Sequence, residues 1–480
     1  MGLARAWRAN RWNAARVKAH MSTLSNSLRQ PPGSTSIAPG LLAWPATACG
    51  AAAVLLFGAF GAFADWLAAS NGWIFFFLAG KPLIDLTWRW SFLHYGTQAV
   101  NPQAIAGVAV LSLNGIALVK RAAWRNLPKR ILVLLALASL SVLLSPSSWA
   151  LNELLRLFAG TAFFYTAGAL LADPQKFDRF SKIFLCAMVV PVLLSYFQWM
   201  GLLPYEYWDW LNGQQVGRAS GTYPTPLSMS FFLYYAFPLA LSIAGSQQQK
   251  SPARAGAFVF LLLASGALAL GNHRTAYVIV ALQVLLWLAL AQGRKAMMAF
   301  LLAVTLIVCL SASWLATLYA PVEGALSGEA NFENGDVFRG RGFQWLLFLN
   351  SYASSGPLHW VFGNGASIVA GYDPEAADVD SVEPHNDYIR ILHAYGAVGL
   401  AVYLSTLAIF LSRTLQMLRS TAEFPRMLAR ILLLALLAVF IQSMMMEPMR
   451  YPTGVWYLFA IASALFSVNP TPPPCERPAL

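Results

Sequence analysis

Two arginines lie at the borders of apolar segments that are long enough to cross a membrane. Arg218 stands shortly before one such segment, and Arg274 begins another, directly after Gly271-Asn272-His273. Arginine at the centre of a membrane helix costs about 2.5–3.5 kcal/mol, so a charge at such a place is a candidate functional residue. Guanidinium groups stay charged and donate paired hydrogen bonds to anions. Each arginine taken alone is also consistent with an interfacial anchor.

A histidine precedes a third apolar segment, in the run Pro384-His385-Asn386-Asp387-Tyr388. Asn386 or Asp387 could cap the first turn of the helix predicted to follow. Histidine titrates near pH 6.5 and can therefore take a proton from a hydroxyl at neutral pH (unperturbed pKa about 6.5). A loop histidine alone is more often structural. Two arginines and one histidine on a single face of a membrane together favour catalysis.

The composition of the chain excludes a soluble enzyme. Of its 480 residues, 58% are hydrophobic and 11% are charged, whereas soluble domains carry about 25% charged residues. Lys and Arg exceed Asp and Glu by 32 − 20 = 12. These basic residues occur in short segments between apolar runs and form no stripe that would indicate nucleic-acid binding. The four cysteines have no CxxC spacing and indicate no metal site.

About twelve apolar runs approach the roughly 20 residues needed to cross about 30 Å of hydrocarbon. The runs lie at about 45–66, 104–119, 131–147, 150–171, 183–203, 226–245, 255–271, 275–291, 297–319, 389–411, 429–446 and 453–468. The predicted fold is an all-α polytopic membrane protein with about 12 transmembrane helices and one large helical periplasmic loop. No internal repeat is visible, so a transporter built from repeats gains no support.

Basic residues in the short loops predict the orientation. They fall within 120–130, 250–254, 294–295 and 413–430, which share one side when every run crosses once. The positive-inside rule makes that side cytoplasmic. We therefore expect a basic, disordered cytoplasmic tail at 1–40, transmembrane helices at 41–318 and 389–468, a periplasmic loop at 319–388 and a Pro-rich cytoplasmic tail at 469–480.

The segment 71–103 does not fit this alternation as a simple crossing, because a second crossing there would reverse the side of the basic loops. We interpret it as a re-entrant or interfacial helix, with a true span as the alternative. Lys81, Asp85 and Arg89, together with Trp88 and Trp90, suit a membrane surface where amphipathic side chains reach water.

The long loop at 319–388 is acidic and contains a periodic part. Apolar residues predict a short amphipathic helix over 343–352 and a second turn over 357–362, which would form a helical cap. The acidic residues between 373 and 387 lack the spacing of an EF-hand. We therefore expect a solvated loop and no metal site.

The sequence resembles a family of bacterial polytopic membrane glycosyltransferases, which comprises the O-antigen ligases and the O-antigen and exopolysaccharide polymerases. The resemblance rests on Arg341 before Trp345, Gly363-Asn364-Gly365, His385-Asn386-Asp387-Tyr388 and Gly396-Ala397-Val398-Gly399-Leu400. Arg218, within Arg-x-Ser-Gly, and Arg274, within Arg-Thr-Ala, are similar to two further functional arginines of the family. The similarity is detailed over about 210–410 and elsewhere concerns hydropathy alone.

The resemblance implies an inverting glycosyltransferase of the bacterial inner membrane that works at the periplasmic face without metal or cofactor. Its donor would be an undecaprenyl-diphosphate-linked oligosaccharide. Arg218 and Arg274 would stabilise the diphosphate leaving group, and His385 would be the base for the acceptor hydroxyl. Arg341 would hold a phosphate or brace the cap. Asn386, Asp387 and Tyr388 would also contact substrate.

The acceptor stays open. A polymerase, which extends a lipid-linked glycan, is favoured because His385-Asn386-Asp387-Tyr388 and the segment from Lys81 to Trp88 look closer to polymerases. The alternative is an O-antigen ligase, which transfers the glycan to lipid A core. A more distant alternative is a lipid-linked glycan transporter, although the charges gather at the outer face and not along a path through the midplane.

Overall fold

The computed structural model describes residues 72–89, 93–95, 98–100, 105–107, 109, 129–144, 148–211, 214–292, 298, 341–365 and 384–468. Every structural statement below concerns these residues, all of which belong to one contact unit, Ser70–Leu480. The predicted tails at 1–40 and 469–480 lie outside them.

Nine of the twelve predicted apolar runs lie on helices. These are α7 (Lys129–Leu144), α8 (Ser148–Leu171), α9 (Pro174–Trp199), α10 (Pro226–Gly245), α11 (Ser251–Gly271), α12 (Arg274–Gln292), α16 (Asp387–Leu418), α17 (Glu423–Met445) and α18 (Pro452–Ser467). Five of the helices, α9, α10, α11, α16 and α17, are long and apolar enough to cross a membrane. The chain is therefore a multi-pass membrane protein.

The count of about twelve crossings stays a prediction. The runs at 45–66 and 297–319 lie outside the described residues, apart from residue 298, and only four residues of the run at 104–119 are described.

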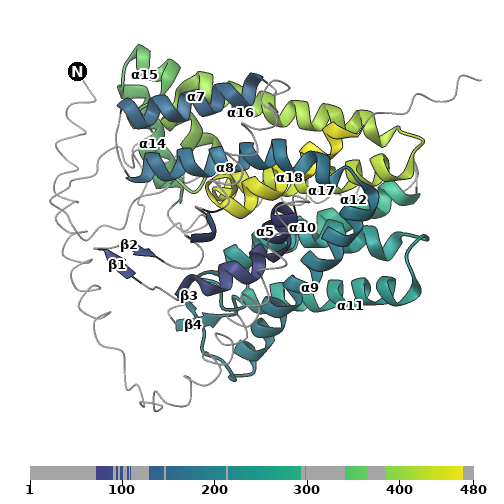
Figure 1. Ribbon diagram of the computed structural model, residues 1–480. Helices are drawn as coiled ribbons and strands as arrows, with labels where there is room; N and C mark the ends of the chain where they lie inside the picture. The colour runs from purple at the N-terminus through teal and green to yellow at the C-terminus, as the bar shows by residue number, and fades with distance from the viewer. Residues whose placement is uncertain are drawn as a thin grey trace, which may run out of the picture. The chain divides into compact units, whose positions relative to one another are not determined.

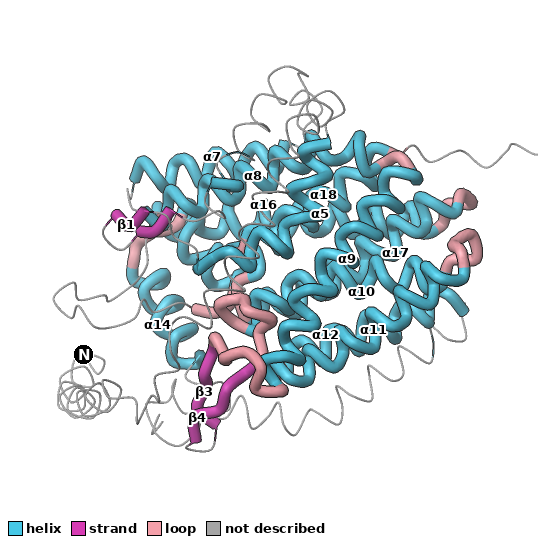
Figure 2. The backbone as a smooth tube through the Cα atoms, turned by 60° about the horizontal axis from the view of Figure 1, so that its bottom comes forward, coloured by secondary structure: helices cyan, strands magenta, loops and turns pink. Residues whose placement is uncertain are grey.

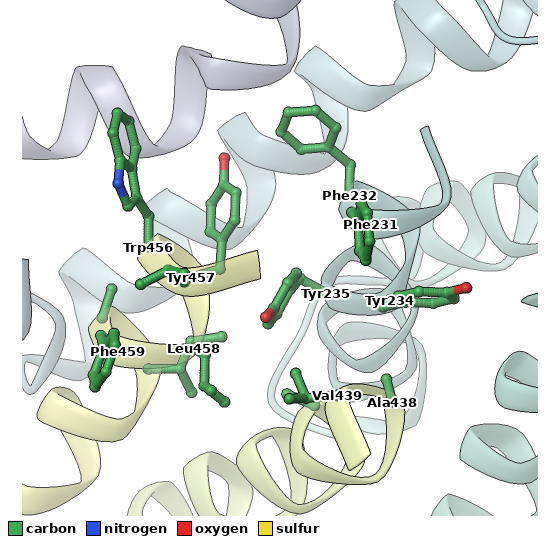
Figure 3. Packing of buried hydrophobic residues seen from close by; sticks show 14 of the residues in the cluster. Phe231, Phe232, Tyr234, Tyr235, Ala438, Val439, Trp456, Tyr457, Leu458 and Phe459 are labelled. Atoms are coloured by element: carbon green, nitrogen blue, oxygen red, sulfur yellow. The ribbon is translucent and has the colours of Figure 1, made fainter. Parts of the chain in front are cut away.

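Helix α10 lies at the centre of the bundle. Its residues are buried on every side, as expected for a helix that is hydrophobic all round. Phe231, Phe232, Tyr234 and Tyr235 on α10 face Ala438 and Val439 on α17 and Trp456, Tyr457, Leu458 and Phe459 on α18 (Figure 3). The buried tyrosine hydroxyls find acceptors on other helices: Tyr235 donates to the carbonyl of Gly454 at 2.6 Å. The core thus joins α10, α17 and α18.

The helices alternate in direction between two ends of the bundle. At one end, Gln248 donates to Glu423 at 2.6 Å, and Gln249 donates to Asp178 at 2.7 Å. These bonds bring together the α10–α11 loop, the α16–α17 loop and the start of α9, and both loops lie at the right of Figure 1. We call this end the basic end, because it carries Lys176, Arg179, Lys182, Lys250, Arg254, Arg413, Arg419 and Arg426.

Two predictions about loop placement can be compared with this arrangement. The loops at 250–254 and 413–430 were predicted to share one side, and the contact between Gln248 and Glu423 confirms it. Arg430 donates to the carbonyl of Leu290, which places the last turn of α12 at the same end. The assignment of this end to the cytoplasm stays a prediction.

The opposite end carries the helices and strands of the candidate site, and we call it the site end. Helices α14 (Arg341–Ser354) and α15 (Pro357–Phe362) lie there. Both are at the left of Figure 1, away from the two loops of the basic end, and α14 is also at the left of Figure 2. The predictions of helices over 343–352 and 357–362 are therefore confirmed. The one-turn helix η4 (Pro448–Arg450) joins α17 to α18 at this end.

The term all-α needs a correction. Two antiparallel hairpins occur, β1 (Leu93–Tyr95) with β2 (Gln98–Val100), and β3 (Tyr207–Leu211) with β4 (Gln214–Arg218). The second hairpin has a sequence signal that the sequence analysis missed. Its strands flank Asn212-Gly213, and Asn-Gly is strongly favoured in the two-residue turns of hairpins.

The interpretation of the segment 71–103 was wrong about two side chains. Helix α5 (Gly72–Asp85), followed by η1 (Leu86–Arg89), spans 14 residues, or about 21 Å, less than the roughly 30 Å of a hydrocarbon core. Lys81 and Asp85 are only 4% and 7% exposed and form an ion pair at 2.8 Å. The carboxylate satisfies the ammonium inside the protein, so neither group needs the membrane surface.

Helix α16 is broken at Gly396 into the half-helix 387–395 and a second part, 397–418. Gly396 has φ 68° and ψ −170°, a conformation that no helix contains. In a straight helix Tyr388 and Tyr403 would be about 22 Å apart along the axis, yet their ring centroids lie 6.1 Å apart. The half-helix therefore folds back beside the second part, and its first residues face the interior of the bundle.

Backbone amides of the segment after α15 cap the broken helix. Asn364 donates to the carbonyl of His393 at 2.8 Å, and Gly365 donates to that of Ala394 at 3.0 Å. The carbonyls of His393 and Ala394 at the break therefore both have a hydrogen-bond donor, as an apolar environment requires.

Replacing Gly396 by Ala should destabilise the protein by at least about 1–3 kcal/mol, because only glycine adopts this backbone conformation easily. An added Cβ would also lie 2.3 Å from the carbonyl oxygen of Val361. Thermal unfolding of the purified variant measures the loss. Gly256→Ala is the matched control, since nothing lies within 4 Å of its Cβ position. Equal melting temperatures for the two variants would contradict the assigned role of Gly396.

Candidate functional site

Arg218 is the last residue of β4 and braces the end of α11. Its Nε donates to the carbonyl of Gly271 at 2.8 Å, and its Nη2 donates to that of Asn272 at 2.7 Å. Arg218 is 8% exposed. A cation at the C-terminal carbonyls of a helix is favourable, because these carry the negative end of the helix dipole. Arg218 thus fixes the turn that leads to Arg274.

A glutamine from α9 holds the other side of the same loop. The Oε1 of Gln198 accepts hydrogen bonds from the backbone amides of Ser220 and Gly221, at 2.9 and 3.0 Å. Its Nε2 donates to the carbonyl of Pro204 at 3.1 Å. Because this side chain is fully buried, it satisfies amides that no water reaches. The loop after Arg218 is therefore tied to α9 and α11.

Arg274 begins α12, directly after the turn that Arg218 braces. Asn272 in that turn has φ 45°, the left-handed conformation that ends α11. His273 lies 3.0 Å from the hydroxyl of Ser230 on α10, measured from Nδ1. The side chain of Arg274 lies outside the described part of the structure, but its backbone position next to the Arg218 loop is defined.

His385 stands at the entrance to the half-helix 387–395, in a left-handed conformation with φ 47°. The residue before it is fixed by α14, since the indole Nε1 of Trp345 donates to the carbonyl of Pro384 at 2.7 Å. The residue after it, Asn386, is the N-cap. Its Oδ1 accepts from the amides of Tyr388 and Ile389 at 3.0 and 3.1 Å, which confirms the predicted cap.

A buried network of charges surrounds Asp387. The side chain of Asp387 is completely buried, and its Oδ2 accepts from the amide of Met449 at 2.9 Å and from the hydroxyl of Ser443 at 3.3 Å. Its Oδ1 accepts from Arg390, from Nη2 at 2.9 Å and from Nε at 3.2 Å. The Nη1 of Arg390 pairs with Glu153 on α8. One guanidinium group therefore joins two carboxylates from two helices.

The other predicted substrate contacts have internal partners or are not described. Asn386 donates from Nδ2 to the carbonyl of Met444 at 3.1 Å, and Tyr388 donates to that of Phe440 at 3.2 Å. Every contact described here for Asn386, Asp387 and Tyr388 is internal to the protein, so substrate binding by them stays a prediction. Arg341 begins α14, and its side chain lies outside the described residues.

The arginine group and the histidine group lie at the same end of the bundle. Ser230, which contacts His273, is followed on α10 by Phe231, and the ring centroid of Phe231 is 4.7 Å from that of Tyr451. Tyr451 follows η4, whose Met449 amide binds Asp387. A short chain of packed residues thus connects the turn before Arg274 with the residue two positions after His385.

Sequence reasoning missed Glu153, Glu447 and the role of Arg390. Glu447 is 2% exposed and interacts electrostatically with Arg390. A signal was present in the sequence, because Glu153 lies inside the apolar run at 150–171 and Glu447 directly follows the run at 429–446. Charges in such places are costly and mark buried pairs or functional sites.

Among the residues that the structure covers, no group of three or more His, Cys, Asp or Glu side chains is arranged to hold a metal ion. Among the described residues, the site end offers a partly buried His385 next to a helix start, and the loop that precedes Arg274.

Comparison with known proteins shows a family match that covers part of the chain. Residues 258–404 match the sequence model of a family described as O-antigen ligase, Wzy_C, and the match includes Arg274, Arg341 and His385 but not Arg218. No curated protein matches the chain. Members of the family are glycan-transferring enzymes of bacterial membranes. This multi-pass membrane protein therefore contains, over residues 258–404, a domain of the Wzy_C O-antigen ligase family.

Proposed function

We propose that the protein transfers a glycan from undecaprenyl diphosphate to an acceptor hydroxyl at the periplasmic face of the bacterial inner membrane. The observation that carries the proposal is the family match over 258–404. Arg274 and His385 belong to the matched residues, and both lie at the end of the bundle opposite the basic loops. By the positive-inside rule the basic end is cytoplasmic, so the site end faces the periplasm.

The proposed reaction is a single displacement. The imidazole of His385 takes the proton of the acceptor hydroxyl while the hydroxyl oxygen attacks the anomeric carbon. The bond from that carbon to the diphosphate oxygen breaks, and undecaprenyl diphosphate leaves with the electron pair, so the configuration at the anomeric carbon inverts. Arg274, which directly follows the turn that Arg218 braces, stabilises the charge that develops on the leaving group.

Arg218 has two roles in the proposed reaction: it contacts the diphosphate, and it holds the turn before Arg274. Two of its nitrogens donate to the carbonyls of Gly271 and Asn272, so it fixes the backbone that carries Arg274. In this proposal Arg218 lies within reach of the diphosphate and also sets the position of Arg274. The two roles are compatible, because a guanidinium group has five N–H donors.

The acceptor is a further lipid-linked repeat, which makes the protein a polymerase of O-antigen or exopolysaccharide. Purified protein supplied with a polyprenyl-diphosphate oligosaccharide as both donor and acceptor should form a ladder of longer chains on a gel. Transfer only after lipid A core is added would identify a ligase instead. Movement of the intact lipid-linked glycan across a vesicle membrane, without any new glycosidic bond, would identify a transporter.

His385→Ala should abolish glycan transfer, because the variant lacks the imidazole that takes the proton of the acceptor in the proposed reaction. The variant should still insert into the membrane and accumulate. The measurement is product formation by purified protein, together with the amount of surface polysaccharide in cells. His359→Ala is the matched control, since His359 lies exposed on α15 at the same end. Full activity of His385→Ala would exclude the proposed base.

Arg274→Lys should lower kcat/KM by about tenfold or more, because lysine keeps the charge but cannot make the paired hydrogen bonds of a guanidinium group. A purely interfacial anchor would tolerate the change. Steady-state kinetics with the lipid-linked donor separate the two cases, with Arg254→Lys at the basic end as the control. Equal kcat/KM values for Arg274→Lys and the control would remove Arg274 from the mechanism.

A further inference from the structure

We propose that Arg390 is a positioning residue that holds His385 where the reaction needs its base, an inference that rests on the proposed function. Arg390 itself lies one turn into the half-helix 387–395 and contacts no residue of the predicted leaving-group site among its described partners. It acts on His385 through Asp387, two residues along the chain.

Arg390 affects the position of His385 by holding the side chain of Asp387. One of its carboxylate oxygens accepts two hydrogen bonds from Arg390, and the other accepts from the amide of Met449 and the hydroxyl of Ser443. The carboxylate is thus held from both sides. Because the backbone of Asp387 is fixed in this way, the left-handed residue two positions earlier is fixed with it.

The opposite side of Arg390 ties the half-helix to the rest of the bundle. Its Nη1 pairs with Glu153 on α8, and both side chains are at least 85% buried. Trp345 on α14 binds the carbonyl of Pro384, and the side chain of Asn386 binds the carbonyl of Met444 on α17, so the residues on both sides of His385 are held by other helices. The half-helix could otherwise rotate about the break at Gly396.

The need to hold His385 in place explains the buried ion pairs of Arg390 better than a gain in the stability of the protein does. Burying an ion pair costs desolvation energy, and apolar residues of similar size often give equal or greater stability. A guanidinium group does have a property that apolar residues lack, since its planar fork fixes the angle between two carboxylates. Arg390 uses three separate nitrogens for Asp387 and Glu153, which lysine cannot do with one.

The experiment compares Arg390→Lys with Arg413→Lys. Arg413 lies on the same helix at the basic end, where it donates to Gln416 and to the carbonyl of Val468. We expect Arg390→Lys to lower kcat about tenfold or more while its affinity for undecaprenyl diphosphate alone stays within about twofold of the control, because small displacements of a reacting group reduce the rate strongly. Glu153→Gln, a milder change at the second contact, should lower kcat in the same direction.

Hydrogen–deuterium exchange of the substrate-free proteins tests the positioning directly. The amides of residues 385–396 and of Met449 should exchange about tenfold faster or more in Arg390→Lys than in Arg413→Lys, since fewer bonds hold the half-helix. Unchanged exchange at these amides would overturn the proposal, as would a kcat of Arg390→Lys within about twofold of the control. Failure of the wild-type protein to transfer glycan would instead overturn the proposed function, and the exchange result would still stand.

Discussion

Inside a membrane, a helix can end only where other parts of the chain satisfy its backbone groups, because lipid offers neither donors nor acceptors. The site end satisfies backbone groups in this way at three helix ends and in one loop. Arg218 donates to the end of α11, Gln198 accepts from the loop before α10, Asn386 caps the half-helix, and the amides of Asn364 and Gly365 complete its other end. The residues that satisfy these ends also fix the loops that carry the candidate site.

The described charged residues differ between the basic end and the site end of the bundle. Basic residues at one end lie on loops and short helix ends, where they reach water or lipid headgroups. Several of the described charges at the site end are buried in ion pairs, namely Arg390 with Asp387 and Glu153, and Lys81 with Asp85. Buried pairs hold geometry at a cost in solvation, whereas surface charges mainly set orientation. One end therefore orients the protein and the other shapes its site.

Much of the fold could be predicted from the sequence. The bounds of α10 agree with the run at 226–245, and both short helices of the long loop were predicted, because apolar periodicity is a local property. The hairpin of β3 and β4 was missed, although Asn212-Gly213 indicates it. Lys81 was placed at the membrane surface because its partner, Asp85, was not recognised as sufficient for burial.

The sequence by itself determined the membrane class of the protein, the order of its apolar helices, a helix cap at Asn386 or Asp387, and the residue types available for chemistry. The tertiary structure alone decided how α16 folds back at Gly396, that Arg390 meets Glu153 across 237 positions of sequence, and that Arg218 ends α11. The reason is physical: hydropathy and caps act within a few residues, whereas buried charges choose partners by proximity in space.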